Sequence, residues 1–89
     1  MSWNYRVVKR TEKLPHFAEP IVTYAIHEVY YDENGDIVNI SEEPRPIISD
    51  DLFGLYDTIG LIEKCLNKKM VIYETGEEEI WKAQSYIMK

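Results

Sequence analysis

The chain has 89 residues, of which 45% are hydrophobic, and a formal net charge of −6. Its length supports one small domain (residues 1–89) that buries about 64% of its surface on folding, which leaves little room for a deep substrate cavity. Its acidity argues against a partner bound through phosphate groups, whether nucleic acid or an anionic membrane surface, because such binding needs clustered lysines and arginines.

The N-terminal third of the chain predicts two strands joined by a loop. Trp3–Val7 alternates apolar and polar side chains, which is the period-2 pattern of a half-buried strand. Residues 9–20 contain two prolines and predict a loop. Ile21–Tyr31 is dense in β-branched and aromatic residues, so it is the strongest strand prediction in the chain.

A hairpin is expected after the second strand. Asn34-Gly35 is a strong signal for a tight turn, and it predicts a partner strand over Ile37–Ser41 that ends before two prolines. A two-residue turn pairs Tyr31 with Val38, Val29 with Ile40 and His27 with Glu42. A three-residue turn with a glycine bulge shifts these partners by one residue.

One amphipathic helix is expected next. Ser49 is its predicted N-cap, and acidic residues follow in the first turn, near the positive end of the helix dipole. Apolar residues then recur at alternating spacings of three and four, which predicts one buried stripe on a helix of about eighteen residues. The stripe consists of Leu52, Leu55, Ile59, Ile62 and Leu66. Gly54 and Gly60 lie off it, where a glycine permits the close approach of another backbone.

The C-terminal segment predicts a short strand and a short final element. Met70–Glu74 is the strand. Thr75 and Glu78 fit a capping box, which predicts a short C-terminal helix, whereas residues 79–88 also fit an extended strand. The expected fold is α+β: an antiparallel sheet of three or four strands with one long helix packed on one face.

The long second strand is apolar on both faces. One face carries Ala25, His27, Val29 and Tyr31, and the other carries Val22, Tyr24, Ile26 and Tyr30. A single helix covers only one face of a small sheet. The second face is therefore expected to be partly exposed or to meet another molecule.

Aromatic residues supply the candidate interface. Seven tyrosines and two tryptophans are many for so small a core, and these residue types anchor protein interfaces because they combine apolar area with a polar tip. The candidate interface residues are Trp3, Tyr5, Tyr24, Ile26, Glu28 and Tyr30. The competing interpretation is that these side chains form only the wet edge of the core.

The two histidines carry the only acid–base hypothesis. Adjacent strand residues point to opposite faces, so His27 cannot pair with Glu28. Glu42, across the hairpin, is the better partner, and the candidate polar pair is His27 with Glu42. Such a pair fits the tuning of stability or of an interface better than catalysis. His16 and His27 match no metal-ligand spacing, so we predict no metal, no cofactor and no catalytic residue.

The single cysteine, Cys65, excludes an internal disulfide and a multi-cysteine metal site, and it is expected to be a structural thiol in the core. The N-terminal residues lack the apolar segment of a signal peptide, and no apolar stretch is long enough to span a bilayer. We therefore expect a cytoplasmic protein.

Charge is divided along the chain. Residues 6–13 are basic, whereas Glu28–Asp51 holds eight acids and one arginine. The plain interpretation is that the two segments lie near each other in the fold and partly neutralise. The functional interpretation is an acidic surface offered to a basic partner.

Two segments resemble a family of small uncharacterised bacterial proteins. Those proteins open with W-N-Y-R and continue with a strand reading I-H-E-V-Y-Y-D-x-x-G, then an E-x-P stretch and one helix. The segments that carry the resemblance are Trp3–Val8 and Ala25–Gly35, and Glu42–Pro44 and the Ser49–Leu66 helix fit the same order. The resemblance covers roughly the first seventy residues. It implies no activity, cofactor or catalytic residue.

Three functions follow from these observations. The first is a small protein-interaction module that binds a protein partner, including a second copy of itself, through the aromatic sheet face. The alternative is an acidic inhibitor that imitates nucleic acid and blocks a basic enzyme, in the manner of phage anti-defence proteins. The third is an enzyme that uses His27 and Glu42, which we do not expect.

Overall fold

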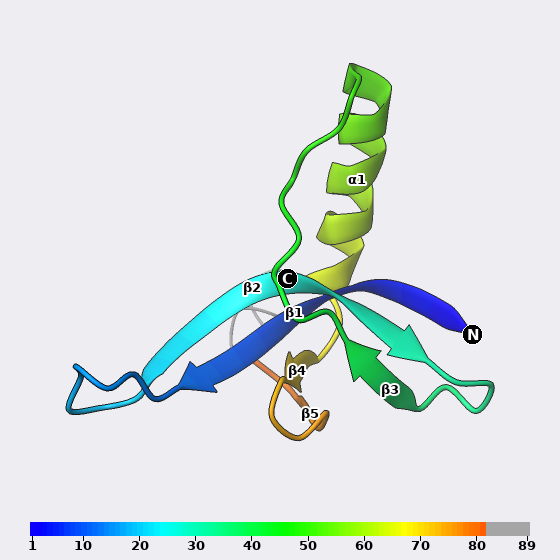
Figure 1. The fold of residues 1–89 in the computed structure, drawn as a ribbon. Coiled ribbons are helices and arrows are strands. Elements are labelled where there is room, and N and C mark those ends of the chain that lie inside the picture. Colours follow the sequence, from blue (N-terminus) through cyan, green and yellow to red (C-terminus); the bar gives the residue numbers. More distant parts are fainter. Residues whose placement is uncertain (82–89) are drawn as a thin grey trace.

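The computed structural model describes residues 1–81, which form five strands and one helix (Figure 1). The elements are β1 (Ser2–Glu12), β2 (Ile21–Tyr31), β3 (Ile37–Ile40), α1 (Leu52–Cys65), β4 (Met70–Ile72) and β5 (Glu78–Glu79). The strands form one curled sheet in the order β3-β2-β1-β4-β5. The α+β class is confirmed, whereas the prediction of three or four strands, all antiparallel, is wrong.

The first strand is longer than predicted. β1 pairs with β2 along its whole length, from Ser2 opposite Tyr31 to Glu12 opposite Ile21. Residues 9–12 were expected in the loop, which was predicted over residues 9–20 from its two prolines. They extend the strand because the start of β2 lies opposite them and pairs with their backbone. The connection is therefore confined to residues 13–20.

The hairpin between β2 and β3 follows both predicted registers in turn. Val29 lies opposite Ile40, as a two-residue turn requires. Closer to the turn, Tyr31 lies opposite Ile37 instead of Val38, and the register shifts between Tyr30 and Tyr31. This shift is the one expected of a three-residue turn, in which Gly35 adopts a φ of 82° that favours glycine.

The fourth strand makes the sheet mixed. β4 runs parallel to β1, with Val8 opposite Val71 and Lys9 opposite Ile72. The chain reaches this position by leaving β3, passing through α1 and returning to the other side of β1. A parallel pair of this kind needs a long crossover, which the helix supplies. Local sequence signals cannot reveal it, because the two strands are about sixty residues apart.

The predicted capping box lies in a turn instead of at a helix start. Gly76, with a φ of 74°, and Thr75 both donate backbone hydrogen bonds to the carbonyl of Ile72. The Thr75 hydroxyl accepts from the backbone N–H of Glu77, and β5 then pairs with β4 from residue 78. The prediction of a helix beginning at Thr75 is therefore wrong, and its continuation over residues 82–88 lies outside the described residues.

The helix begins later than predicted. Asp51, not Ser49, is the N-cap, and its Oδ1 accepts a 2.6 Å hydrogen bond from the backbone N–H of Gly54. A Cβ on Gly54 would collide with the Ser49 side chain, so this glycine permits the tight entry of the chain into α1. The helix is consequently 14 residues long, shorter than expected.

Apolar side chains pack on both faces of the sheet. Val7 and Met70 form one cluster with Cys65 of α1. Val8, Val29 and Val71 form the second cluster on the opposite face. The sheet therefore carries two small cores, and α1 contributes to only one of them.

The helix stands on the sheet by its C-terminal end and projects away from it (Figure 1). Of the predicted stripe, Ile62 and Leu66 pack against the Val7 cluster. Leu52 is 82% exposed and Ile59 is 48% exposed, so the prediction that the whole stripe packs on the sheet is wrong. The reason is the linker over residues 41–51, whose last backbone tie to β2 is from Arg45 to Ile26. It then follows α1 to its free end (Figure 1).

Candidate functional site

The six candidate interface residues all lie on one face of the sheet. The β1–β2 register places Trp3 opposite Tyr30, Tyr5 opposite Glu28 and Val7 opposite Ile26, with Tyr24 further along opposite Lys9. Side chains opposite one another share a face, as do residues two apart along a strand. This aromatic face comprises Trp3, Tyr5, Tyr24, Ile26, Glu28 and Tyr30. It is the face on which α1 stands, which corrects the expectation that the helix covers the other one.

The helix covers only the middle of the aromatic face. Tyr5 and Ile26 are half-buried against the Val7 cluster. Trp3 is 48% exposed and makes an edge-to-face contact with Tyr5, at 5.3 Å between ring centroids. Tyr24 is 62% exposed. The two ends of the aromatic face, at Trp3 and at Tyr24, are thus exposed.

The polar members of the aromatic face hold the linker. The Tyr30 hydroxyl donates to Glu28 at 3.2 Å, and Arg45 of the linker lies 3.6 Å from the same carboxylate. Partial burial and the hydrogen bond to Glu28 raise the pKa of Tyr30. These three residues therefore fix the base of the linker against the sheet.

A groove lies in the angle between α1 and β1, with a volume of about 350 Å³. Trp3 and Tyr5 form its sheet wall, and Leu61 and the stems of Lys64 and Lys68 belong to its helix wall. Lysine stems can cover apolar surface while their ammonium groups stay in water. The groove can accept an apolar side chain near a cationic rim.

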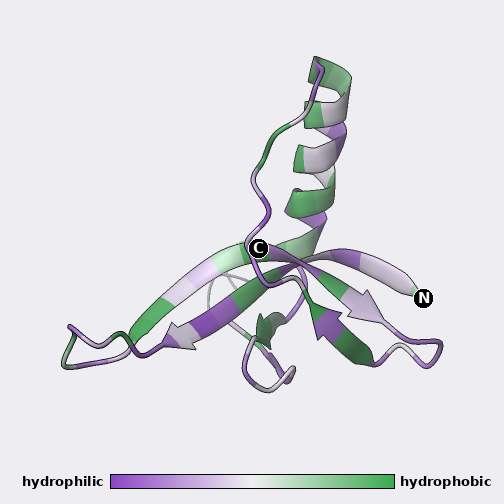
Figure 2. Ribbon diagram, in the orientation of Figure 1, coloured by the Kyte–Doolittle hydropathy of each residue, from purple (hydrophilic) through white to green (hydrophobic). Residues whose placement is uncertain are grey.

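Helix α1 carries several highly exposed apolar residues, including two that were not predicted from the sequence. Phe53 is 85% exposed and Tyr56 is 78% exposed, beside the exposed Leu52 and Ile59. These four residues, Leu52, Phe53, Tyr56 and Ile59, are called the free stripe below. Figure 2 shows apolar residues continuing to the free end of the helix. The available signal was that α1 carries apolar residues on two sides, whereas one sheet can cover only one.

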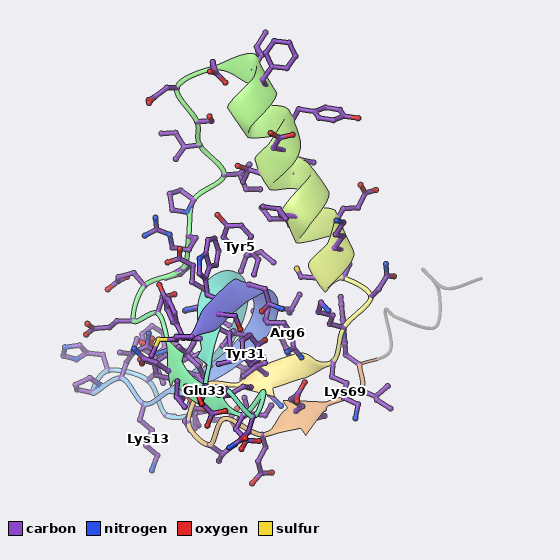
Figure 3. All side chains as sticks on the ribbon, turned by 90° about the vertical axis from the view of Figure 1, so that its right-hand side faces the viewer. Tyr5, Arg6, Lys13, Tyr31, Glu33 and Lys69 are labelled. Carbon is purple, nitrogen blue, oxygen red and sulfur yellow. The ribbon has the colours of Figure 1, made fainter. Side chains whose placement is uncertain are left out.

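The opposite face of the sheet is held by a buried arginine. Arg6 is 5% exposed, and its Nη2 donates to Glu78 Oε2 at 2.5 Å and to the carbonyl of Lys69 at 2.6 Å. Its Nη1 donates to the Tyr31 hydroxyl at 2.8 Å, and Figure 3 shows the two side chains. The Tyr31 hydroxyl in turn donates to Asn4 Oδ1. Burial works to lower the pKa of Arg6, but its hydrogen bonds to Glu78 and Tyr31 outweigh burial and raise it. The Arg6 side chain therefore connects β1 to β2 and β5 through hydrogen bonds.

The structure does not bring His27 and Glu42 together as a pair. His27 is 2% exposed, and its Nδ1 donates to the carbonyl of Ser41 at 2.8 Å. Glu42 is exposed, and its backbone carbonyl accepts from Arg10 at 2.9 Å. A substrate in solution cannot reach the His27 ring in this conformation. The imidazole therefore acts as a tie between β2 and the start of the linker.

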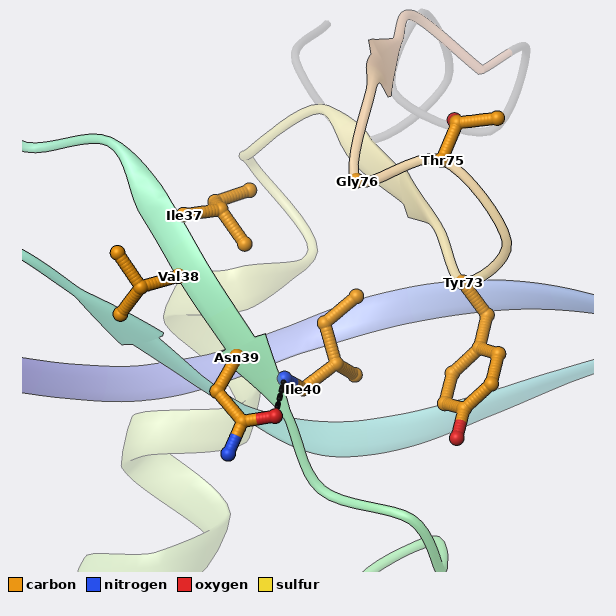
Figure 4. Close-up of a pocket in the computed structure, with 7 residues that line it drawn as sticks. All are labelled: Ile37, Val38, Asn39, Ile40, Tyr73, Thr75 and Gly76. Carbon is orange, nitrogen blue, oxygen red and sulfur yellow. Dashed lines mark hydrogen bonds between the residues drawn. The ribbon is translucent and has the colours of Figure 1, made fainter.

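A second hollow lies between β3 and the turn after β4, with a volume of about 330 Å³ (Figure 4). Its lining residues are Ile37, Val38, Asn39, Ile40, Tyr73, Thr75 and Gly76. The Asn39 side chain is occupied by a 2.9 Å hydrogen bond from the backbone N–H of Ile40. Among the described residues, this lining contains no acid–base pair and no nucleophile beside a base.

The acidic block does not form one continuous surface. Asp32 and Asp36 lie at the β2–β3 turn, whereas Asp50 and Asp51 lie at the free end of α1 (Figure 1). The basic start is partly neutralised within the described residues, but through Glu78 and Glu12 and not mainly through the acidic block.

Cys65 lies in the core, where it is 1% exposed. Burial raises the pKa of its thiol, against smaller opposing effects of Arg6 and Lys68. The structural role expected for this thiol agrees with its position in the Val7 cluster. His16 lies in the exposed connection between β1 and β2.

The buried thiol gives an expected pH dependence. The folded pKa lies above the unfolded one, so the unfolded chain loses its proton first. The stabilisation is complete below the unfolded pKa, about 8.5, and is lost as the pH rises through the folded value. Urea unfolding between pH 7 and pH 10.5 measures this loss, and a Cys65→Ala variant, although less stable, should lack this component of the slope. Identical slopes in both proteins would contradict the assignment.

Residues 1–81 contain neither a membrane-spanning helix nor a cluster of metal ligands. Within residues 1–81, no helix has the length and apolar character needed to cross a bilayer. In the same part of the chain, no three histidine, cysteine, aspartate or glutamate side chains are grouped so that they could hold a metal ion.

Comparison of the chain with protein-family models, with curated proteins and with solved structures finds no significant match. The resemblance to small bacterial proteins stays a prediction, and the function has to be argued from the surface of the molecule.

Proposed function

We propose that this chain is a protein-interaction module that binds a protein partner through the free stripe of α1 and the open ends of the aromatic face. The observation that carries the proposal is the exposure of Phe53 and Tyr56 on a helix that projects from its own sheet. A reducing cytoplasm, which suits the free thiol of Cys65, is part of the proposal.

The size of the exposed surface supports a protein partner. The free stripe presents about 600 Å² at the observed exposures, if a fully exposed large apolar residue presents roughly 200 Å². The largest apolar patch on a typical monomer is about 300–600 Å² and is often functional. Phenylalanine, tyrosine and tryptophan are also enriched at protein interfaces. This surface is therefore better suited to another protein than to solvent.

The acidic inhibitor is the alternative proposal. The net charge of −6 supports it. The separation of Asp32 and Asp36 from Asp50 and Asp51 argues against it, because a protein that imitates nucleic acid needs its acidic residues in a continuous row. Catalysis by His27 and Glu42 ranks third, since the buried ring of His27 is bonded to Ser41.

Affinity capture tests the interaction with matched variants. Tagged wild-type chain is exposed to lysate and, separately, to the untagged chain. We expect a stoichiometric protein that stays bound when the salt rises from about 0.05 to 0.5 M, because apolar contacts are not screened. Phe53→Ser should remove it, whereas Asp57→Ser, another exposed site on α1, should retain it.

Two outcomes would contradict this function. One is that no protein binds in stoichiometric amount. The other is a partner that is released by salt and is indifferent to Phe53→Ser, which would favour the acidic inhibitor.

A further inference from the structure

The free stripe lies on the N-terminal turns of α1, which project beyond the sheet. With about 3.6 residues per turn, Leu52, Tyr56 and Ile59 fall in one row along the helix, and Phe53 falls in the next. Leu66 lies further along the row of Leu52 and Ile59 and packs on the sheet together with Ile62, because this row reaches the sheet only at the C-terminal end of α1. Figure 3 shows the upper turns of α1 with their side chains directed into solvent.

Gly60 lies beside the free stripe, in the row of Phe53. A Cβ built on this residue meets no atom of the described chain within 4 Å. Glycine in the interior of an exposed helix costs about 1 kcal/mol relative to alanine. Gly54 is explained by its contact with Ser49, but nothing within residues 1–81 explains Gly60. A second helix lying along the free stripe would use the space that this glycine leaves.

The two ends of α1 carry opposite charges. Asp50 and Asp51 lie at the N-terminal end of α1, and Lys64, Lys68 and Lys69 lie at or after its C-terminal end. Two such helices side by side and antiparallel bring Asp50 and Asp51 of each toward the C-terminal end of the other, where the three lysines outnumber the single acid, Glu63. The antiparallel arrangement also aligns the two helix dipoles favourably. A parallel arrangement would place like charges together.

We infer that the partner of the free stripe is a second copy of this chain, whose α1 lies antiparallel across it with the two-fold axis near Tyr56. The inference rests on the proposed function and names its partner. Phe53 of one copy then lies near Ile59 of the other, and Leu52 lies near Gly60. The centre of this interface is apolar and its rim is charged, as in protein interfaces generally.

The geometry of α1 permits this pairing. Tyr56 lies nine residues before Cys65, so the crossing is about 14 Å along the helix from the sheet. The sheets of the two copies are therefore kept apart. Complete burial of both free stripes would remove about 1,200 Å² of apolar surface from water, which is the lower limit for a stable interface. Because each contact occurs twice, the surface is self-complementary, as a two-fold dimer requires.

Disulfide formation at single introduced cysteines tests the axis. Tyr56→Cys places one thiol of each copy at the two-fold axis, and we expect a covalent dimer on mild oxidation with oxidised glutathione. Glu63→Cys is the matched control: it is exposed and lies two turns further along the row of Tyr56, so its two copies are far apart in an antiparallel pair. The wild-type chain, whose only thiol is the buried Cys65, is the control for disulfide formation through Cys65 itself.

The two variants separate the possible arrangements. A dimer with Tyr56→Cys and none with Glu63→Cys supports the antiparallel pair. Dimers with both variants indicate parallel helices and overturn it. Dimers with neither variant overturn it as well.

Light scattering of the purified wild-type chain supplies an independent measurement. We expect twice the chain mass at high concentration, and Tyr56→Glu should raise the dissociation constant by about 100-fold, because it sets two carboxylates against each other at the axis. A wild type that is monomeric at all concentrations overturns self-association. If another protein is still captured through Phe53, the interaction function stands and only this partner is wrong.

Discussion

Replacing Arg6 by alanine is expected to lower the free energy of unfolding by about 3 kcal/mol, which for a chain of this length corresponds to a fall in Tm of roughly 15 °C. The side chain is almost completely buried and joins Tyr31, the Lys69 carbonyl and Glu78. Its removal leaves the carbonyl without a donor and opens a cavity between the strands. The value is at the lower end for a buried ion pair because Glu78 is partly exposed.

Arg10→Ala is the matched control for this prediction. Arg10 lies on the same strand and the same face as Arg6, but its side chain is more exposed. It stacks on the Tyr73 ring at 4.2 Å and pairs with Glu12, and contacts of this kind contribute about 1 kcal/mol or less. Thermal unfolding at one fixed protein concentration compares the two, because self-association shifts Tm. Equal losses would contradict the assigned role of Arg6.

The residues of the aromatic face could be grouped from the sequence because strands alternate with a strict period of two. Trp3 and Tyr5 share a face whatever their partners, and so do Tyr24 and Tyr30. The register of the β2–β3 hairpin could not be determined from the sequence pattern alone. Both the two-residue and the three-residue turn fitted Asn34-Gly35, and the structure uses each over part of its length by a shift beside Tyr31.

Non-local pairing decided the features that the sequence did not reveal. The polar residues 9–12 form a strand only because the start of β2 lies opposite them. The parallel pairing of β4 with β1 depends on where the crossover through α1 returns, and no local signal encodes that path. Thr75 and Glu78 satisfied a capping pattern, but Thr75 instead caps a turn that returns the chain to pair with β4.

The helix marks the limit of sequence reasoning about the site. Its apolar spacing correctly predicted a helix, yet the spacing does not state what covers each residue. Ile62 and Leu66 meet the sheet, whereas Leu52 and Ile59 of the same stripe do not. Helix α1 thus carries more apolar residues than its own sheet buries. That surplus is the strongest argument that the chain is completed by a partner.

Replacing His27 by alanine is expected to lower the free energy of unfolding by about 3 kcal/mol, because the change empties a buried site and leaves the Ser41 carbonyl without its donor. Glu42→Ala should change it by less than about 0.5 kcal/mol, since Glu42 is exposed and its contact with Arg10 is made by the backbone. Urea unfolding measures both variants.

The double variant distinguishes a structural histidine from one paired with a carboxylate. If His27 is bonded to Ser41 alone, the effects of His27→Ala and Glu42→Ala add to within about 0.5 kcal/mol. A coupling of 1 kcal/mol or more would mean that the two side chains interact, and the polar pair would return as a candidate site. Additivity would instead leave the imidazole as the tie that holds the start of the linker against β2. The path of that linker is what carries α1, with its free stripe, away from the sheet.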